Sequence, residues 1–289
     1  MTTKKNTLEH IIHGIFLLMG LVAVGCVLLI TVYLVLSGIP AILEIGLIDF
    51  LFGKEWASTA TDPKYGIWAF ILTSIYGTAG AIVIGVPIGF MTAVYLSKIA
   101  SPKVKSMMQS AVSLLAGIPS VVYGLVGMLV LVPGIRKIFG VPDGASLLAA
   151  IIVLAIMILP SIIKMSITAL DAVPKEYEDA SLALGSTPIE TYFKVSVPAA
   201  RSGIAAAVVL GVGRAIGEAM AVMMVAGNVP NMPDSIFQSV RFLTTAVSSE
   251  MAYSSGLQQQ ALFSIALVLF LFIMLINATL NFFLKRETE

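Results

Sequence analysis

The sequence predicts an all-α, polytopic membrane protein with six transmembrane helices. Hydrophobic residues make up 58% of the chain and charged residues 11%, whereas soluble domains carry about 25% charged residues. Six apolar segments are long enough to cross a bilayer core, which requires about 20 residues. The basic residues concentrate in alternate connections between these segments. Together these observations exclude an ordinary soluble domain.

The first span, 11–36, contains no Lys, Arg, Asp or Glu. It is much longer than the roughly 7–15 apolar residues of a signal peptide, so we expect a retained helix. Pro87, Pro119 and Pro160 fall within or beside later spans and predict kinks, because each removes an intrahelical hydrogen bond. The remaining spans are expected within 67–96, 107–132, 145–165, 202–226 and 261–284.

The orientation follows from the 17 Lys and Arg residues. With both termini in the cytoplasm, eleven lie inside, five lie outside, and Arg214 lies within the membrane. This excess agrees with the positive-inside rule, with the Arg136-Lys137 pair as the local exception. The inner set includes Lys4 and Lys5 at one end of the chain and Lys285 and Arg286 at the other.

The cytoplasmic connection 174–198 is too polar to span a membrane. Pro174 can open a helix, and Gly185 is a natural end to it. Thr187 with Glu190 then has the form of a capping box, with Pro188 at the first helical position. The pattern predicts a helix, a sharp turn and a second helix. Such a unit can transmit force to a soluble partner or can lie passively on the membrane surface.

The fifth span carries a charged pair, Arg214 and Glu218. Each charge at mid-bilayer costs on the order of 2.5–3.5 kcal/mol, which makes intramembrane charges candidates for function. Their spacing of four residues places them on one face of a continuous helix, where they can pair. Arg214 is predicted to meet an oxyanion, with Glu218 holding it or acting as a gate. The alternative is an ion pair that locks the helix to its neighbour. Gly213 and Gly217 favour close approach of another helix.

Several chemistries have no support. The net charge of +1 and the absence of a basic patch argue against nucleic-acid binding. No residues are assigned as catalytic or metal-ligating, and no GxxxxGK[ST] loop is present to hold ATP. The single cysteine, Cys26, is expected to be a buried, inert thiol. A secondary transporter and a membrane-embedded enzyme are rival classes, but the internal repeats or paired acids that they require are missing.

The cytoplasmic connection resembles the loop of ABC importer permeases that begins Glu-Ala-Ala. Asp179-Ala180-Ser181 occupies its first positions, Gly185 has the required spacing, and Val195-Ser196-Val197-Pro198 matches its end. Asp for Glu, Ser for Ala and the two valines are departures. The resemblance implies a coupling loop that inserts into a groove of an ATPase subunit. Its expected residues are Glu178, Asp179, Ala180, Ser181, Gly185 and Pro198.

Segments 115–125, 211–222 and 53–56 resemble the PstC family of phosphate permease subunits. This resemblance implies a type I (MetI-like) permease fold of six transmembrane helices, of which about five form the core. The N-terminal helix and outer loop would occupy residues 1–66, and the permease domain would occupy residues 67–286. The resemblance also implies a second permease PstA, two copies of the ATPase PstB and the external binding protein PstS, in a bacterial or archaeal plasma membrane. Arg214 and Glu218 would lie on the substrate pathway, with Gly213, Gly217 and Pro119 in helix packing. ATP and Mg would bind the partner ATPase, with no cofactor on this chain. The sister family PstA and importers of sulfate or molybdate remain alternatives.

Overall fold

A computed structural model describes the backbone of residues 2–286, with the side chains of Glu9 and of residues 12–279. The side chains of Lys4, Lys5, Lys285 and Arg286 therefore lie outside the described ones. The fold is all-α except for one two-stranded hairpin, which confirms the predicted fold class. Five helices in the described residues are long and apolar enough to span a membrane, or six if one bent pair is counted as a single span.

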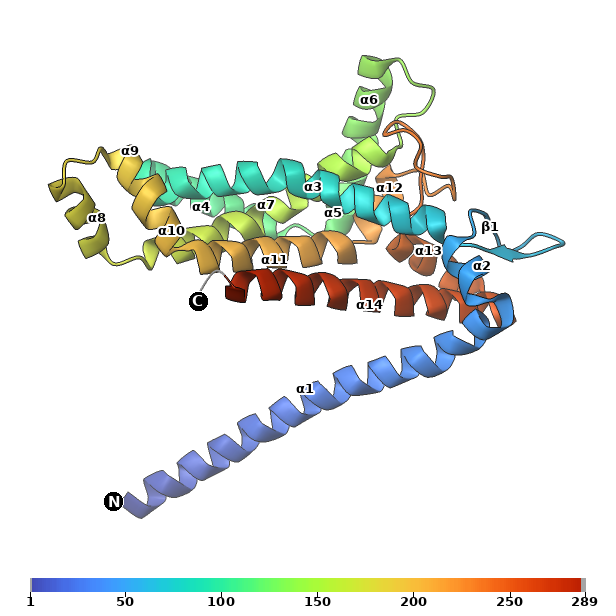
Figure 1. The fold of residues 1–289 in the computed structure, drawn as a ribbon, viewed down its shortest axis with the longest axis horizontal. Coiled ribbons are helices and arrows are strands. Elements are labelled where there is room, and N and C mark those ends of the chain that lie inside the picture. Colours follow the sequence, from blue (N-terminus) through green and yellow to red (C-terminus); the bar gives the residue numbers. More distant parts are fainter. Residues whose placement is uncertain (1, 287–289) are drawn as a thin grey trace.

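Helices α3, α7 and α11 form the centre of the bundle, and α14 runs beside α11 (Figure 1). Most of the apolar window of α7 is buried, because α3 and α11 both pack against it. Ile158 and Ile162 of α7 fill the space left by Gly85 and Gly89 of α3. The bounds are α3 Trp68–Val94, α7 Leu147–Asp171, α11 Arg201–Gly217 and α14 Gly256–Arg286.

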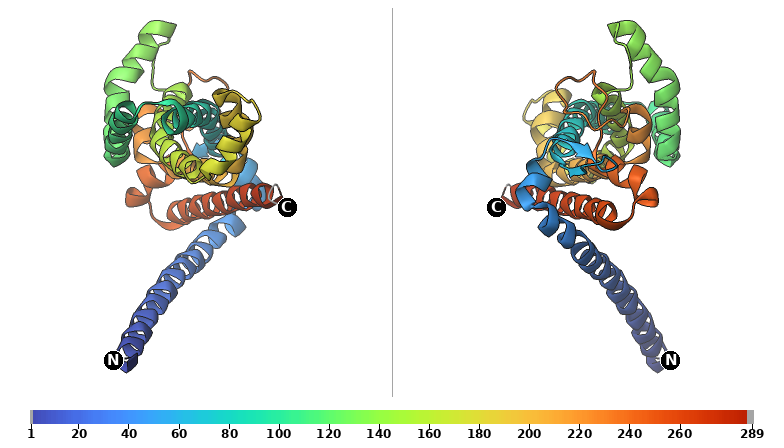
Figure 2. Two further views of the ribbon diagram at one scale, coloured as in Figure 1. Left: turned by 90° about the vertical axis from the view of Figure 1, so that its left-hand side faces the viewer. Right: turned by 90° about the vertical axis from the view of Figure 1, so that its right-hand side faces the viewer.

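Helix α1, Thr2–Ile45, diverges from this bundle. It packs against α14 near its end and then leaves the body of the molecule, which both side views show (Figures 1 and 2). The helix continues beyond the predicted limit at residue 36 and through Pro40. Its apolar side chains within residues 12–30 are exposed, and Cys26 is exposed with them. The expectation of a buried cysteine is therefore wrong, because no other part of the described chain covers this stretch of the helix.

The third and fifth predicted spans are broken: the first break lies at the kink predicted for Pro119, whereas the second corrects the prediction of a continuous fifth helix. In the third span, α4 ends at Gly117 and α5 begins at Ser120. Pro119 disfavours helical backbone at Ile118, which is extended at φ −70° and ψ 127°. In the fifth, α11 ends at Gly217 and α12 begins at Met220. The bounds are α4 Pro102–Gly117, α5 Ser120–Val126, a π-helical turn Gly127–Leu131, α6 Val132–Phe139 and α12 Met220–Val225.

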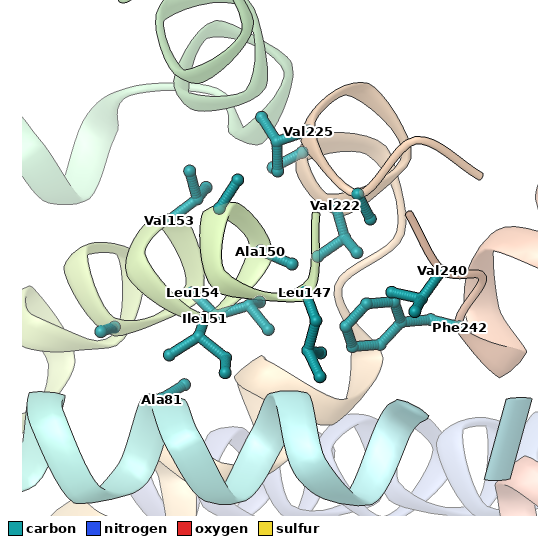
Figure 3. Packing of buried hydrophobic residues seen from close by; sticks show 14 of the residues in the cluster. Ala81, Leu147, Ala150, Ile151, Val153, Leu154, Val222, Val225, Val240 and Phe242 are labelled. Atoms are coloured by element: carbon teal, nitrogen blue, oxygen red, sulfur yellow. The ribbon is translucent and has the colours of Figure 1, made fainter. Parts of the chain in front are cut away.

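One end of the bundle, called the hairpin end here, is covered by the connection before α3 and by the connection after α12 (Figure 1). A hydrophobic cluster joins α7 to α12 and to the segment that holds Val240 and Phe242 (Figure 3). A second cluster centres on Phe50, Trp56 and Phe70. The elements here are α2 Leu47–Phe52, β1 Trp56–Ala57, β2 Lys64–Tyr65, α13 Leu243–Glu250 and a 3-10 turn Met251–Tyr253.

The opposite end carries a helical knuckle, defined here as residues 174–198. It projects beyond the bundle at the end where α1 begins and α14 finishes (Figure 1). The pair formed by Pro188–Ala199 and Arg201–Gly217 bends by 71° as the chain enters the bundle. The elements at this end are α8 Lys175–Ala183, α9 Pro188–Thr191, α10 Val197–Ala199 and the π-helical turns Tyr95–Ile99 and Tyr192–Ser196.

Candidate functional site: a broken-helix crossing and a helical knuckle

Glu218 lies at the break between α11 and α12. Its backbone is extended, with φ −74° and ψ 127°, and its carbonyl accepts a hydrogen bond from Thr244 Oγ1 at 2.8 Å. Its Oε1 accepts from the backbone N–H of Ala221 at 3.1 Å. The carboxylate thus satisfies one of the unpaired N–H groups at the start of α12. In this conformation Glu218 caps the second half of the span.

Arg214 does not pair with Glu218, so that part of the prediction is wrong. A pair at this spacing needs continuous helix, and α11 ends one residue before Glu218. Within the described part of the chain, Arg214 makes no ion pair or hydrogen bond with another side chain. It lies in an open groove of about 520 Å³ between α7, α11 and α14, close enough to Tyr123 for an electrostatic interaction.

The two broken spans cross. A Cβ placed on Gly124 of α5 would lie 2.8 Å from Cα of Ala221 in α12, so the two backbones are in direct contact. Tyr123 Oη donates to the carbonyl of Leu115 at 2.7 Å, which bridges the break at Pro119. Both sequence segments singled out above, 115–125 and 211–222, therefore meet in the membrane-spanning region. Pro119 acts by ending one helix and starting the next.

Gly213 and Gly217 do not serve packing between helices of the described chain. A Cβ on either residue would meet no atom within 4 Å there. Gly203 and Gly211 instead approach α7, through Ala169 and Ile162. A role for Gly213 and Gly217 in contact with another subunit stays a prediction.

The knuckle has the predicted local geometry. Helix α8 begins after Pro174, and Gly185 has the left-handed φ of +90° that ends it. Thr187 Oγ1 accepts from the N–H of Glu190 at 3.4 Å, and Glu190 Oε2 accepts from the N–H of Thr187 at 3.2 Å. Pro188 occupies the first helical turn. The helix–turn–helix interpretation is confirmed, whereas a role in coupling is not tested by this geometry.

A charged contact anchors the knuckle to α3. Lys98 Nζ lies 2.6 Å from Glu178 Oε1, and the two side chains are only 10% and 18% exposed. Ser196 Oγ also donates to Glu178 Oε1, at 2.7 Å. Burial raises the pKa of the Glu178 carboxyl, but the hydrogen bonds from Lys98 and Ser196 outweigh it and hold the pKa below its ordinary value. Sequence reasoning missed Lys98, which lies 80 residues from Glu178.

The far side of the knuckle presents apolar side chains to its surroundings. Leu184 is 89% exposed and Ile189 is 62% exposed. Among the predicted coupling residues, Asp179 and Ala180 are exposed beside them, and Ser181 bonds across the knuckle to Thr191 at 3.0 Å. Pro198 is exposed where the chain turns back into the bundle. Such an apolar tip on an otherwise polar loop is typical of a protein-binding surface.

The hairpin end contains a polar network centred on Glu250. Its carboxylate accepts hydrogen bonds from Trp56 Nε1 at 3.2 Å, from Ser58 Oγ at 3.2 Å and from Gln258 Nε2 at 3.1 Å. Arg241 pairs with the same carboxylate and donates to the Asn228 carbonyl. The network ties together two connections that are almost 200 residues apart in the sequence. In the described residues, no group of three or more His, Cys, Asp or Glu is arranged to hold a metal.

The fold belongs to a known class of membrane transport protein. The chain superposes on a solved structure of the MetNI methionine ABC transporter with a TM-score of 0.57 at 21% identity, covering 78% of this chain and 95% of that one. The architecture is thus the type I, MetI-like fold of ABC importer permeases.

Residues 85–287 match the family described as binding-protein-dependent transport system inner membrane component, and the chain belongs to this family. It is 41% identical to a probable ABC transporter permease protein, YqgH, of Bacillus subtilis over 89% of this chain and 86% of the relative. It is 33% identical to the phosphate transport system permease protein PstC of Pasteurella multocida over 77% of this chain and 75% of that protein. The chain is therefore a multi-pass membrane protein and an ABC importer permease, and such permeases are transport components rather than catalysts.

Proposed function

We propose that this chain is the permease subunit of an ATP-driven phosphate importer, which moves inorganic phosphate from an external binding protein into the cytoplasm by alternating access. The observation that carries the proposal is Arg214, a guanidinium in the last turn of α11 without an acidic partner in the described chain. An uncompensated charge in a bilayer must face water, a ligand or another subunit. A guanidinium is suited to bidentate contact with a phosphate oxyanion.

Glu218 contributes to the same pathway through its backbone position. While its carboxylate caps α12, it does not neutralise Arg214, which leaves the cation available to an anion. If the break at residues 218–219 changes shape during transport, the carboxylate can turn toward Arg214 and displace the anion. Glu218 would then act as a gate, set by the conformation of the broken helix.

The knuckle supplies the link to ATP hydrolysis. Its exposed apolar tip at Leu184 and Ile189 matches what a groove on a soluble ATPase would bury. The contact between Glu178 and Lys98 would pass movement of the tip to α3. Asp179, Ala180, Ser181, Gly185 and Pro198 shape this unit. Nucleotide and Mg would be bound by the ATPase, with no cofactor held by this chain.

The proposed assembly pairs this chain with a second permease, PstA, above two copies of PstB, and PstS docks on the outer connections. Both chain ends would lie in the cytoplasm of a bacterial or archaeal cell. Figure 1 supports this arrangement, because α1 begins and α14 finishes at the end of the molecule that carries the knuckle. Membrane lipid would cover the faces that no subunit occupies.

The test is uptake of labelled phosphate by cells that depend on the complete transporter. Arg214→Gln removes the guanidinium, and a hydrogen bond to a charged group is worth about 1.5–3 kcal/mol. Uptake is therefore expected to fall roughly tenfold to hundredfold, while the ATPase subunit still co-purifies. Arg136→Gln, at an exposed outer position, is the matched control and should transport normally. Undiminished phosphate uptake by Arg214→Gln at normal abundance, or uptake of sulfate or molybdate in its place, would contradict the proposal.

A further inference from the structure

The groove that holds Arg214 contains two more polar side chains, Ser161 of α7 and Asn277 of α14. Its other lining residues are Val209, Leu210 and Gly213, and no acidic residue lines it. The side chains of Ser161 and Asn277 make no hydrogen bond with the described part of the chain, and both are partly exposed. Three helices thus contribute one unsatisfied polar group each to a single groove within the membrane-spanning region.

The three groups lie well inside the bundle. At about 1.5 Å per residue, Arg214 lies roughly 20 Å from the start of α11 at Arg201. Ser161 lies roughly 15 Å from the end of α7 at Asp171, and Asn277 roughly 14 Å from the end of α14 at Arg286. All three of these helix ends lie on the knuckle side of the molecule (Figure 1). Each group therefore lies more than two helical turns from the knuckle-side end of its helix.

Such a set of groups has a consistent chemistry. Polar side chains at this depth are unfavourable against lipid and instead face protein or water. The Asn277 amide and the Ser161 hydroxyl can both donate hydrogen bonds to an oxyanion. Neutral donors bind it more weakly than a guanidinium does. Conduction requires sites weak enough to release what they bind, and the two neutral donors beside the guanidinium meet this requirement.

We infer that Ser161 and Asn277 are further binding residues for the transported oxyanion and form with Arg214 a water-filled track between α7, α11 and α14. The inference rests on the proposed phosphate permease function. In this track the guanidinium, the amide and the hydroxyl bind the anion together as it passes. Because no acidic residue lines the groove, no carboxylate there repels an anion.

Thiol labelling tests the track without requiring transport. Cys26 is the single cysteine, so Cys26→Ser gives a cysteine-free background for Asn277→Cys and Ser161→Cys in the complete transporter. Membrane fragments, which are open to the reagent on both sides, are treated with a sulfonate-bearing methanethiosulfonate, an anionic thiol reagent that crosses lipid poorly. Leu275→Cys is the matched control, because Leu275 lies at nearly the same depth on another face of α14 and is 65% exposed.

A wet track exposes the ionised thiol, so Asn277→Cys and Ser161→Cys should react roughly tenfold faster than Leu275→Cys or more. Millimolar inorganic phosphate should slow both reactions, and adding Arg214→Gln should lower the rate with the anionic reagent relative to a cationic one. Labelling no faster than at Leu275→Cys, as expected if lipid or a second subunit covers these residues, would overturn the inference. Fast labelling that phosphate does not slow would also overturn it. Neither result depends on the uptake assay of Arg214→Gln, which decides the proposed function separately.

Discussion

Replacing Lys98 by alanine removes the anchor that holds the knuckle to α3. Lys98 Nζ lies 2.6 Å from Glu178 Oε1, with 10% and 18% of the two side chains exposed. Breaking a fully buried pair costs about 3–5 kcal/mol, and a hydrogen bond to a charged group is worth about 1.5–3 kcal/mol. The pair retains some solvent, and Ser196 stays bonded to the carboxylate. We therefore expect a loss of about 2 kcal/mol, or roughly 30-fold in the equilibrium that docks the knuckle.

The assay is the ratio of phosphate transported to ATP hydrolysed by the reconstituted transporter. Lys98→Ala should lower this ratio because the knuckle can move without moving α3. Lys105→Ala is the control: it removes a different charged contact at this end, to Asp171 at 2.8 Å, which joins α4 to α7 and does not involve the knuckle. An unchanged ratio in Lys98→Ala at normal abundance would refute the reasoning. A double-mutant cycle with Glu178→Gln isolates the energy of the pair.

The pH dependence gives the same pair a second readout. The folded-state pKa of Glu178 is lowered, so its contribution is present above the ordinary glutamate pKa of about 4.3 and is lost as pH falls through the lower folded value. Coupling in the wild type should thus be insensitive to this group between about pH 5 and 7. In Lys98→Ala the contact that lowers the pKa of Glu178 is lost, while the burial that raises it remains. The pKa of Glu178 should therefore rise, and coupling should weaken at a higher pH than in the wild type.

Two glycines give further predictions. Gly185→Val forces a branched side chain into a φ of +90° with open space around it, a strain of about 1–3 kcal/mol. Gly185→Val should uncouple ATP hydrolysis from uptake. The control is Gly140→Val in the connection after α6, where φ is +66° and the space is equally open; it should leave the coupling ratio unchanged. Equal effects of the two substitutions would contradict the role of the knuckle. Gly124→Ala places a Cβ 2.8 Å from Ala221 Cα and should destabilise the purified protein by about 1–3 kcal/mol in thermal unfolding. Gly134→Ala meets nothing within 4 Å and should be neutral or stabilising, and equal melting of the two variants would argue against the crossing of α5 and α12.

Much of this protein follows from the sequence because the signals are local. Membrane insertion depends on the length and apolarity of single segments. The knuckle could be predicted residue by residue, because Pro174, Gly185 and the Thr187–Glu190 capping box act within one turn of backbone. The charge of Arg214 within an apolar span likewise marked a candidate site before any contact was known.

The broken spans and the contacts of the site were decided by tertiary structure. A proline signals the break at Pro119, but the break before Glu218 depends on Thr244 holding its carbonyl and on α12 docking against Gly124. Periodicity assumes an unbroken helix, and so it wrongly paired Arg214 with Glu218. Lys98, Asn277 and Ser161 gave no local signal, because their significance comes from helices that only folding brings together. Sequence alone determined that the chain crosses the membrane and carries a charge within one span. The packing of separate helices decided what that charge faces, because contacts between segments that are distant in the chain produce no periodic pattern in the sequence.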